Sequence, residues 1–350
     1  MTLAAKRTGI GLALLLAWVS GCGPRQPDRA LYQFQGGAMG TSFSVKVVSD
    51  PLSSEQERAI DETIRRELEE VNARMSTYLE TSELSRLNRW TAPGPLAVSP
   101  ELLAVLLVAK EAGQATRGAY DITIGPLVNA WGFGPKGSPP APPPDAELTR
   151  LRQLTGWDKI EIDQAQSTVR KAAPEIFLDL SGVAKGYAVD RVAEALIAMN
   201  CPHHLVEVGG EVRARGVNER GVPWRIGIET PVAGARRVQR ALALDGLAMA
   251  TSGDYRNFHE LDGARYAHII DPRTAKPVRH SLASVSVIDA ACARADAFAT
   301  GLMVLGGEEG LSVAEECNLA ALFLIRESDG KLAERSTSRF RELFGEGMRP

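Results

Sequence analysis

A lysine in the first turn of an expected helix is the residue of this sequence that most suggests chemistry. It is Lys185, in the segment Leu-Asp-Leu-Ser-Gly-Val-Ala-Lys-Gly-Tyr-Ala-Val-Asp from Leu178 to Asp190. A helix N-terminus carries unpaired N–H groups and about half a positive charge, so a cation there is unfavourable unless an anion binds beside it. The expected strand over 177–180, the Ser181-Gly182 break and the helix start therefore indicate a phosphate or diphosphate cradle. An ordinary strand, turn and helix with a solvated lysine would give the same pattern.

A second pair of polar residues lies in an otherwise apolar stretch towards the C-terminal end. Asp296 and Thr300 are spaced at i and i+4, so both side chains project from one face of an expected helix. A carboxylate and a hydroxyl are oxygen ligands of the kind that Mg²⁺ takes together with waters and substrate phosphate oxygens. An aspartate that stabilises the helix dipole and a threonine bonded to its own helix backbone remain the alternative.

The segments that would position these residues mix helical and strand patterns. Apolar residues between Ser54 and Tyr78 recur at helical spacing after a capping-box pattern at Ser54 and Glu57. A second helix is expected to open at Ser99-Pro100 and to close at Gly118. Two further helices are expected over 294–305 and from there to about residue 317.

Short alternating or apolar runs predict strands over 43–47, 159–163, 205–208, 224–229, 240–244 and 319–325. Asp262-Gly263 predicts a hairpin turn between strands over 255–259 and 265–270. The proline-rich stretch 134–144 is typical of an exposed loop. Since strands and helices do not alternate regularly, we predict an α+β fold of mixed, mainly antiparallel sheets with packed helices.

Residues 1–21 have the pattern of a bacterial lipoprotein signal peptide. Lys6 and Arg7 precede an apolar run over 10–19 that is too short to cross a bilayer. The run ends at Cys22 in a sequence that resembles the lipoprotein box, so Cys22 is the expected site of lipidation. A secretory signal with an incidental cysteine is the alternative.

Residues 22–35 are expected to form the lipidated N-terminus and a tether, and residues 36–350 the folded domain. With 44% hydrophobic and 24% charged residues and a net charge of −3, the chain is typical of a globular protein. No basic stripe favours a nucleic-acid partner. Cys201, Cys292 and Cys317 are far apart and odd in number, so they predict neither a disulfide framework nor a zinc site.

Eight short motifs follow one another along most of the chain. They are Ala-Met-Gly-Thr (38–41), Met-Ser-Thr-Tyr (75–78), Gly-Ala-Tyr-Asp-Ile-Thr (118–123) with Trp-Gly-Phe-Gly (131–134), the segment 178–190, Val-Gly-Gly-Glu (208–211), Ala-Thr-Ser-Gly-Asp-Tyr-Arg-Asn (250–257), His-Ile-Ile-Asp-Pro (268–272) and Ala-Asp-Ala-Phe-Ala-Thr (295–300). Each motif alone is weak. Together and in this order, they closely resemble the ApbE family of FAD:protein FMN transferases.

The resemblance implies a Mg²⁺-dependent enzyme that splits FAD, attaches FMN through its phosphate to a threonine or serine of an acceptor protein, and releases AMP. Residues 36–350 would be the FMN transferase catalytic domain, with an ApbE-like fold close to the T-fold. The acceptors would be flavoproteins of membrane redox complexes. The lipid anchor would hold the protein in the bacterial cell envelope, at the inner or outer membrane, facing the periplasm.

The resemblance also assigns roles to individual residues. The residues that would bind the flavin nucleotide are Met39, Tyr78, Ala119, Tyr120, Asp121, Asp179, Lys185 and Ile270. Asp296, Thr300 and the backbone carbonyl of Gly182 would bind Mg²⁺. Lys185 would then act in catalysis by neutralising the diphosphate together with the metal.

His268 is the expected general base for the acceptor hydroxyl, because an imidazole titrates near neutrality and the family motif places it beside the site. A structural histidine is the alternative, with Asp271 or a group of the acceptor taking the proton. One departure from the family pattern is Ala275, where the family has glycine. An alanine is strained at that position if its φ is positive.

Two other functions remain open at this point. The protein could hydrolyse FAD to FMN and AMP as a pyrophosphatase, with water in place of the acceptor. It could also be a non-catalytic flavin-binding lipoprotein. The Asp296 and Thr300 pair argues against the second, since a passive flavin binder has no need of a hard-cation site.

Overall fold

An antiparallel sheet of eight strands forms the centre of the molecule. The computed structural model describes residues 29–134, 137, 141–231, 237–254, 258–261 and 264–346. In sheet order the strands are β1 (Ala30–Ala38), β2 (Thr41–Ser49), β6 (His203–Val208), β7 (Glu211–Arg215), β10 (Leu247–Gly253), β15 (Leu282–Asp289), β16 (Ala320–Arg326) and β17 (Leu332–Ser336). All neighbouring pairs are antiparallel, which confirms the predicted α+β class.

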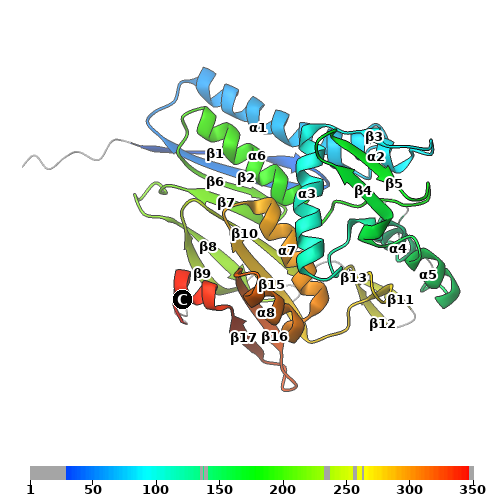
Figure 1. The fold of residues 1–350 in the computed structure, drawn as a ribbon. Helices are drawn as coiled ribbons and strands as arrows, with labels where there is room; N and C mark the ends of the chain where they lie inside the picture. Colours follow the sequence, from blue (N-terminus) through cyan, green and yellow to red (C-terminus); the bar gives the residue numbers. More distant parts are fainter. Residues whose placement is uncertain are drawn as a thin grey trace, which may run out of the picture.

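Helices cover one face of this sheet, as Figure 1 shows. They are α1 (Ser54–Met75), α3 (Pro100–Ala115), α6 (Ala184–Ala198), α7 (Cys292–Leu305) and α8 (Gly307–Glu316), with α2 (Glu83–Asn88) beside α1. Their apolar sides and the strand residues that face them form the main hydrophobic core. Burial of this apolar surface is the main driving force that holds helices and sheet together.

A smaller layer covers the opposite face. It consists of the hairpin of β8 (Trp224–Glu229) and β9 (Val238–Leu244) with α9 (Ser338–Phe344). Neighbouring strand residues point to opposite faces, so Val47 lies in the main core and Val48 in this second one. Buried on both faces, β16 is continuously apolar from Ala320 to Leu324.

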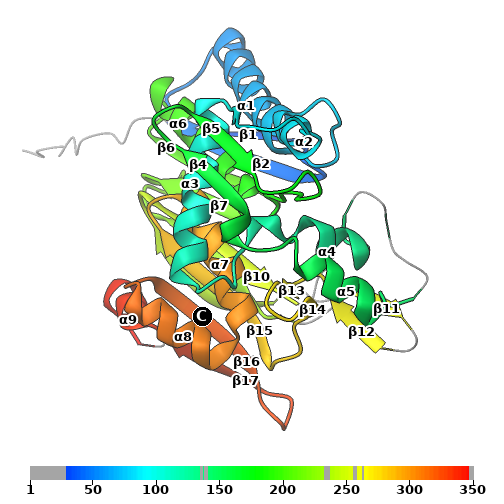
Figure 2. The same ribbon diagram turned by 45° about the vertical axis from the view of Figure 1, so that its right-hand side comes forward.

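The remaining strands and helices lie on the right-hand side of Figure 1, and Figure 2 brings that side forward. They are β3 (Leu96–Ala97), β4 (Ile160–Asp163), β5 (Thr168–Lys171), α4 (Gly125–Ala130), α5 (Asp145–Arg152), the hairpin β11 (Phe258–Leu261) and β12 (Ala264–Ala267), and the pair β13 (Ile270–Asp271) and β14 (Lys276–Pro277). A third apolar cluster joins α4, α5 and the β13–β14 segment.

The helix predictions hold to within a few residues. The capping box of α1 uses Ser53 and Gln56, one residue before the predicted pair, and the helix ends at Met75 rather than Tyr78. α3 begins at Pro100 after the N-cap Ser99, as predicted. Gly118 closes it with φ +81° and an N–H bond of 2.8 Å to the Gly113 carbonyl.

Three backbone predictions are wrong, and one of them is the strand over 265–270, since β12 ends at Ala267. β1 begins at Ala30, inside the predicted tether, because Tyr32 and Phe34 alternate with polar residues and pack against the main core. The segment 177–180 belongs to no strand. Its backbone is paired instead with the Asn88 side-chain amide, which bonds the N–H and carbonyl of Leu178 at 2.7 and 2.9 Å.

Several sequence predictions fall outside the described residues. They concern the signal peptide over 1–21, Cys22, the Asp262-Gly263 turn and part of the loop over 134–144. In the part of the chain that the structure describes, no helix has the length and apolarity required to cross a membrane. Cys201, Cys292 and Cys317 are free thiols.

Candidate functional site

The N-terminal ends of α6 and α7 meet, and each is capped by a carboxylate from the other helix. Gly186 N–H, in the first turn of α6, donates to Asp296 Oδ2 at 3.0 Å. Cys292 and Ala293 N–H, at the start of α7, donate to the two oxygens of Asp190 at 2.9 Å each. Neither helix has a side-chain cap of its own. These carboxylates therefore satisfy N–H groups that a helix start leaves unpaired, and both charges suit the helix dipole.

The two helices approach so closely that a side chain at position 186 would not fit. A Cβ on Gly186 would lie 2.4 Å from the Cys292 carbonyl oxygen. The Lys-Gly pair in the motif thus has a packing reason for its glycine. The last residue of the motif, Asp190, has one as well, since it also pairs with Arg213 of β7 at 2.7 Å.

Lys185 does have an anionic partner, and the protein itself supplies it. Its Nζ lies 2.6 Å from Glu211 Oε1, at the first residue of β7. The Lys185 side chain is 30% exposed and that of Glu211 only 5%. Burial would lower the pKa of Lys185, but Asp296 and Glu211 more than offset burial and raise it, so the lysine stays charged. Burial raises the pKa of Glu211 to about 7, although Lys185 opposes that shift.

The predicted metal ligands lie beside this charge pair. A Cβ on Gly182 would be 2.9 Å from Thr300 Oγ1, so the turn before α6 lies directly against α7. Ser252 Oγ of β10 lies 3.4 Å from the same threonine oxygen. Asp296 is buried, and burial raises its pKa against the effect of Lys185. Asp296 and Thr300 lie one turn apart on α7, and Gly182 lies against Thr300. A carboxylate, a hydroxyl and a carbonyl are donors of the kind that a hard cation takes.

Tyr120 forms part of the same wall. Its ring would lie 3.2 Å from a Cβ on Gly182, and its backbone is held by Thr116 Oγ1 and the Trp157 indole N–H at 3.0 and 2.9 Å. The buried Tyr120 hydroxyl has no hydrogen-bond partner among the residues that the structure describes. Burial, followed by Asp296 and Asp179, raises its pKa well above the ordinary value. Because a buried hydroxyl without a partner is costly, this group is poised to bond a ligand.

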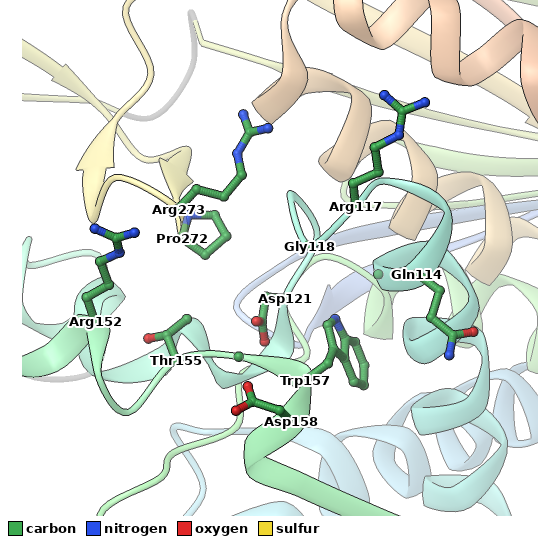
Figure 3. A pocket seen from close by; sticks show the side chains of 12 residues that line it. Gln114, Arg117, Gly118, Asp121, Arg152, Thr155, Trp157, Asp158, Pro272 and Arg273 are labelled. Carbon is green, nitrogen blue, oxygen red and sulfur yellow. The ribbon is translucent and has the colours of Figure 1, made fainter.

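Asp121 follows Tyr120 in the chain and reaches a different surface. It lines an open cleft of about 530 Å³ (Figure 3). The guanidinium groups of Arg117, Arg152 and Arg273 surround the cleft, with Trp157 towards its other end. Asp121 Oδ1 accepts hydrogen bonds from the Thr123 N–H and hydroxyl at 2.8 and 2.6 Å. Burial nevertheless raises the pKa of Asp121 to about 6.

Tyr78, Phe133 and His268 form a second polar and aromatic group. Tyr78 is 65% exposed, and its hydroxyl donates to the Phe133 carbonyl at 3.3 Å. Phe133 meets the His268 ring edge to face, with centroids 6.3 Å apart. His268 is half-buried in the bend between β12 and β13, not in the predicted strand. Burial, and after it Asp179, raise the pKa of Tyr78, and Asp179 also contributes to the raised pKa of Tyr120.

The other predicted residues differ in their settings. Met39 lies in the two-residue β1–β2 turn with φ +52°, a strained conformation for methionine of the kind that functional sites retain. Buried Ala119 adjoins Tyr120. Ile270 packs in the third apolar cluster, to which Lys185 does not belong. Ala275 has φ +62°, so the strain expected for alanine at this glycine position is present.

Glu211, Asp190 and Ser252 are site residues for which the sequence pattern indicated no role. Glu211 and Ser252 occur in two of the eight motifs, and Asp190 ends a third. Their position in motifs was a signal, but their role depends on which strand lies next to which helix. Only the sheet order supplies that information.

Comparisons with known proteins agree with this architecture. A family model described as the ApbE family matches residues 39–323. An FAD:protein FMN transferase of Vibrio cholerae is 43% identical over 332 residues, 95% of this chain and 97% of the relative. One of Escherichia coli K12 is 36% identical and covers 84% of each chain.

Two solved structures extend the likeness to the fold. The flavin transferase ApbE from Vibrio cholerae superposes with a TM-score of 0.83 and 42% identity, over 90% of this chain and 100% of that chain. The apo form of the Pseudomonas stutzeri flavinyl transferase ApbE gives 0.82 and 37%, over 91% and 98%. From its sequence match, its fold and the arrangement of its motifs, this chain belongs to the ApbE family.

Proposed function

We propose that this protein is an FAD:protein FMN transferase that attaches FMN through a phosphoester to a threonine or serine of an acceptor flavoprotein and releases AMP. The observation that carries the proposal is that the start of α6, which holds Lys185, meets Asp296 of α7. Thr300, one turn further along α7, lies against Gly182 in the turn before α6, and the Tyr120 hydroxyl beside that turn has no hydrogen-bond partner among the described residues. The names of the Vibrio cholerae and Escherichia coli relatives support this activity.

The reaction exchanges one phosphorus–oxygen bond for another. The acceptor hydroxyl oxygen would bond to the phosphorus on the FMN side of the diphosphate. The bond from that phosphorus to the bridging oxygen would break, and AMP would leave with the bridging oxygen. The hydroxyl proton would pass to a base. Because negative charge grows on the leaving oxygen, fixed positive groups beside the diphosphate favour the reaction.

Lys185 would be the fixed cation. Its pKa is raised by Asp296 and Glu211, so it would remain charged throughout the neutral range. The Tyr120 hydroxyl could donate to a ligand oxygen, since no described residue takes that bond. Tyr78 would offer its exposed ring as a stacking face for the flavin or adenine ring. Met39, Ala119, Asp121, Asp179 and Ile270 complete the proposed nucleotide-binding set.

The residues also fit a Mg²⁺ ion. Asp296, Thr300 and the Gly182 carbonyl would hold it, and the close approach of Gly182 to Thr300 Oγ1 supports that grouping. These donors leave coordination positions for waters and substrate oxygens. When bound, the ion would neutralise charge on the diphosphate.

His268 is the proposed base for the acceptor hydroxyl. The alternative, Asp271, is already engaged, since Arg273 Nε and Nη2 contact its two oxygens at 3.0 and 3.1 Å. His268→Ala should slow transfer by about 100-fold, the usual value of a positioned base, without lowering FAD affinity. Transfer by this variant at the wild-type rate would show that another group takes the proton.

One assay separates the proposed function from the two alternatives. The full-length protein in detergent is incubated with FAD, Mg²⁺ and a candidate flavoprotein acceptor. AMP release is measured together with flavin fluorescence that survives denaturing electrophoresis. A transferase gives both, an FAD pyrophosphatase gives AMP without a fluorescent band, and a passive flavin binder gives neither.

The proposal includes the cellular setting. Lipidation at Cys22 would anchor the protein in the cell envelope, facing the periplasm, where membrane redox complexes would supply its acceptors. The apolar run over 10–19 and the cysteine after it support this placement. Cys22→Ser should move the protein from the membrane to the soluble fraction. Unchanged membrane association would rule the anchor out.

A further inference from the structure

Glu211 is a buried carboxylate for which the proposed reaction has no direct task. It is 4% exposed and begins β7. Its Oε1 contacts Lys185 Nζ at 2.6 Å, and its Oε2 has no hydrogen-bond partner within the described part of the chain. An ionised carboxylate in such a place is costly unless it is paired. Lys185 is therefore the partner that makes the buried charge tolerable.

The turn before Glu211 is built closely around the lysine. Gly209 and Gly210 connect β6 to β7 with φ +63° and +109°. A Cβ on Gly209 would lie 3.1 Å from Lys185 Cδ and 3.0 Å from Thr41 Cγ2. Gly209 N–H donates to the Ser42 carbonyl at 3.0 Å, which ties the turn to the start of β2. In the motif Val-Gly-Gly-Glu, Gly209 thus lies against the lysine stem and Glu211 contacts its ammonium.

We propose that Glu211 is a positioning residue that holds the Lys185 ammonium at the start of α6 for the diphosphate of FAD. This inference rests on the proposed function, since it assumes that Lys185 meets that diphosphate. Lysine has a long, flexible stem, so an ammonium fixed in advance spares the cost of ordering it when the ligand binds. Glu211 would not touch the substrate and would act through Lys185.

A purely structural ion pair would explain the same distance, and a double-mutant cycle separates the two roles. The variants are Glu211→Met, Lys185→Met and the double variant, which replaces both charges by buried apolar groups of similar length. For each, the FAD dissociation constant is measured by calorimetry in the presence of Mg²⁺, and the unfolding midpoint in urea is measured separately.

The expected results differ between the two readouts. Glu211→Met should weaken FAD binding about tenfold when Lys185 is present and less than about twofold in the Lys185→Met background. Each single variant should be less stable than the wild type, because it leaves one charge unpaired. The double variant should recover stability but not affinity.

Glu67→Met is the matched control. Glu67 is another buried carboxylate that pairs with a cation of α6, Arg191, at 2.9 Å. Its loss should lower stability while FAD affinity and AMP release stay at wild-type values. If Glu211→Met does not fold, Glu211→Asp keeps the charge but draws it back from the lysine, and it should weaken FAD binding by a smaller factor.

The proposal fails if Glu211→Met weakens FAD binding equally in both backgrounds, or if neither Glu211 variant weakens it. A wild-type protein that binds FAD but releases no AMP would contradict the proposed reaction. The double-mutant cycle could still be interpreted in that case, because it measures FAD binding. A wild-type protein that does not bind FAD would overturn both.

Discussion

Two neighbouring regions of this molecule are rich in charged side chains, and they differ in how those charges are held. At the starts of α6 and α7, Lys185, Glu211 and Asp296 are buried or half-buried, and their partners come from separate elements. Around the open cleft near Asp121, Arg273 also pairs with a buried carboxylate, Asp271, but other pairs lie at the surface. Arg117 and Glu316, for example, are 55% and 53% exposed.

The difference shows what can be pre-arranged for a ligand. Exposed ion pairs are screened by water and fix little geometry. Buried groups paired across a helix start cannot relax, so their charges stay where the fold places them. We therefore assign the chemistry to the crowded helix starts, although the cleft is the more visible hollow. Four predictions test this contrast, from the largest expected effect to the smallest.

Asp296→Asn should lower the rate of AMP release by at least about 100-fold, because it removes the charge of the proposed metal site. The asparagine oxygen can still accept the hydrogen bond from Gly186 N–H, so the fold should be retained. Chromatographic measurement of AMP and circular dichroism test both parts. Asp296→Ala should lose the same activity and also about 1 kcal/mol of stability with the helix cap. Full activity in Asp296→Asn would show that Asp296 is not a ligand of a required Mg²⁺.

Asp190→Ala should cost about 3 kcal/mol of unfolding free energy, the range expected when a buried ion pair is broken. The change leaves Arg213 and two N–H groups of α7 without their acceptor. Urea denaturation measures the loss, and Asp190→Asn, which keeps one acceptor, should lose less. A loss below about 0.5 kcal/mol would mean that the crossed caps do not hold the helices together.

Asp121→Asn should raise stability at pH 7 by on the order of 2 kcal/mol. Burial raises the folded-state pKa of Asp121 from 3.8 to about 6, so the folded protein binds the proton more tightly than the unfolded chain. Stability therefore falls as pH rises between those values, and the cost is fully present above them. Asparagine keeps the oxygen that Thr123 bonds but carries no charge. Equal pH dependence of urea unfolding in variant and wild type would contradict this.

Glu316→Gln should change the unfolding free energy by less than about 0.5 kcal/mol, because its pair with Arg117 is exposed. AMP release should also be unchanged. A loss of stability comparable to that of Asp190→Ala would erase the contrast between the two regions.

The sequence predicts which residues carry the chemistry of the site better than it predicts which residues contact one another there. Lys185 stands out because a cation is unfavourable at a helix start, and Asp296 because it interrupts an apolar helix. The partners of these residues could not be found in this way. Glu211 is distant in sequence from Lys185, and only the placement of β7 beside α6 brings them together.

In the fold too, elements with a clear local pattern are predicted and those that depend on tertiary contacts are not. Helices with strong apolar periodicity, such as α1, are predicted to within a few residues. β10 and β15 are missed, since they are buried strands that contain small and hydroxyl residues instead of a clear alternation. The segment 177–180 looks like a strand because it is apolar, but a side-chain amide from Asn88 occupies the place of a neighbouring strand. Whether a side chain takes the place of a neighbouring strand depends on tertiary contacts.

The central claim is that the site moves FMN, with its phosphate, from FAD to a protein hydroxyl. FAD carrying a radioactive phosphorus on the riboflavin side tests it directly, with wild type and Asp296→Asn compared in the presence of Mg²⁺ and a flavoprotein acceptor. The account predicts label in the acceptor, in a threonine or serine peptide, and unlabelled AMP from the wild type alone. Label that remains in free FMN, or an unlabelled acceptor despite AMP release, would contradict it.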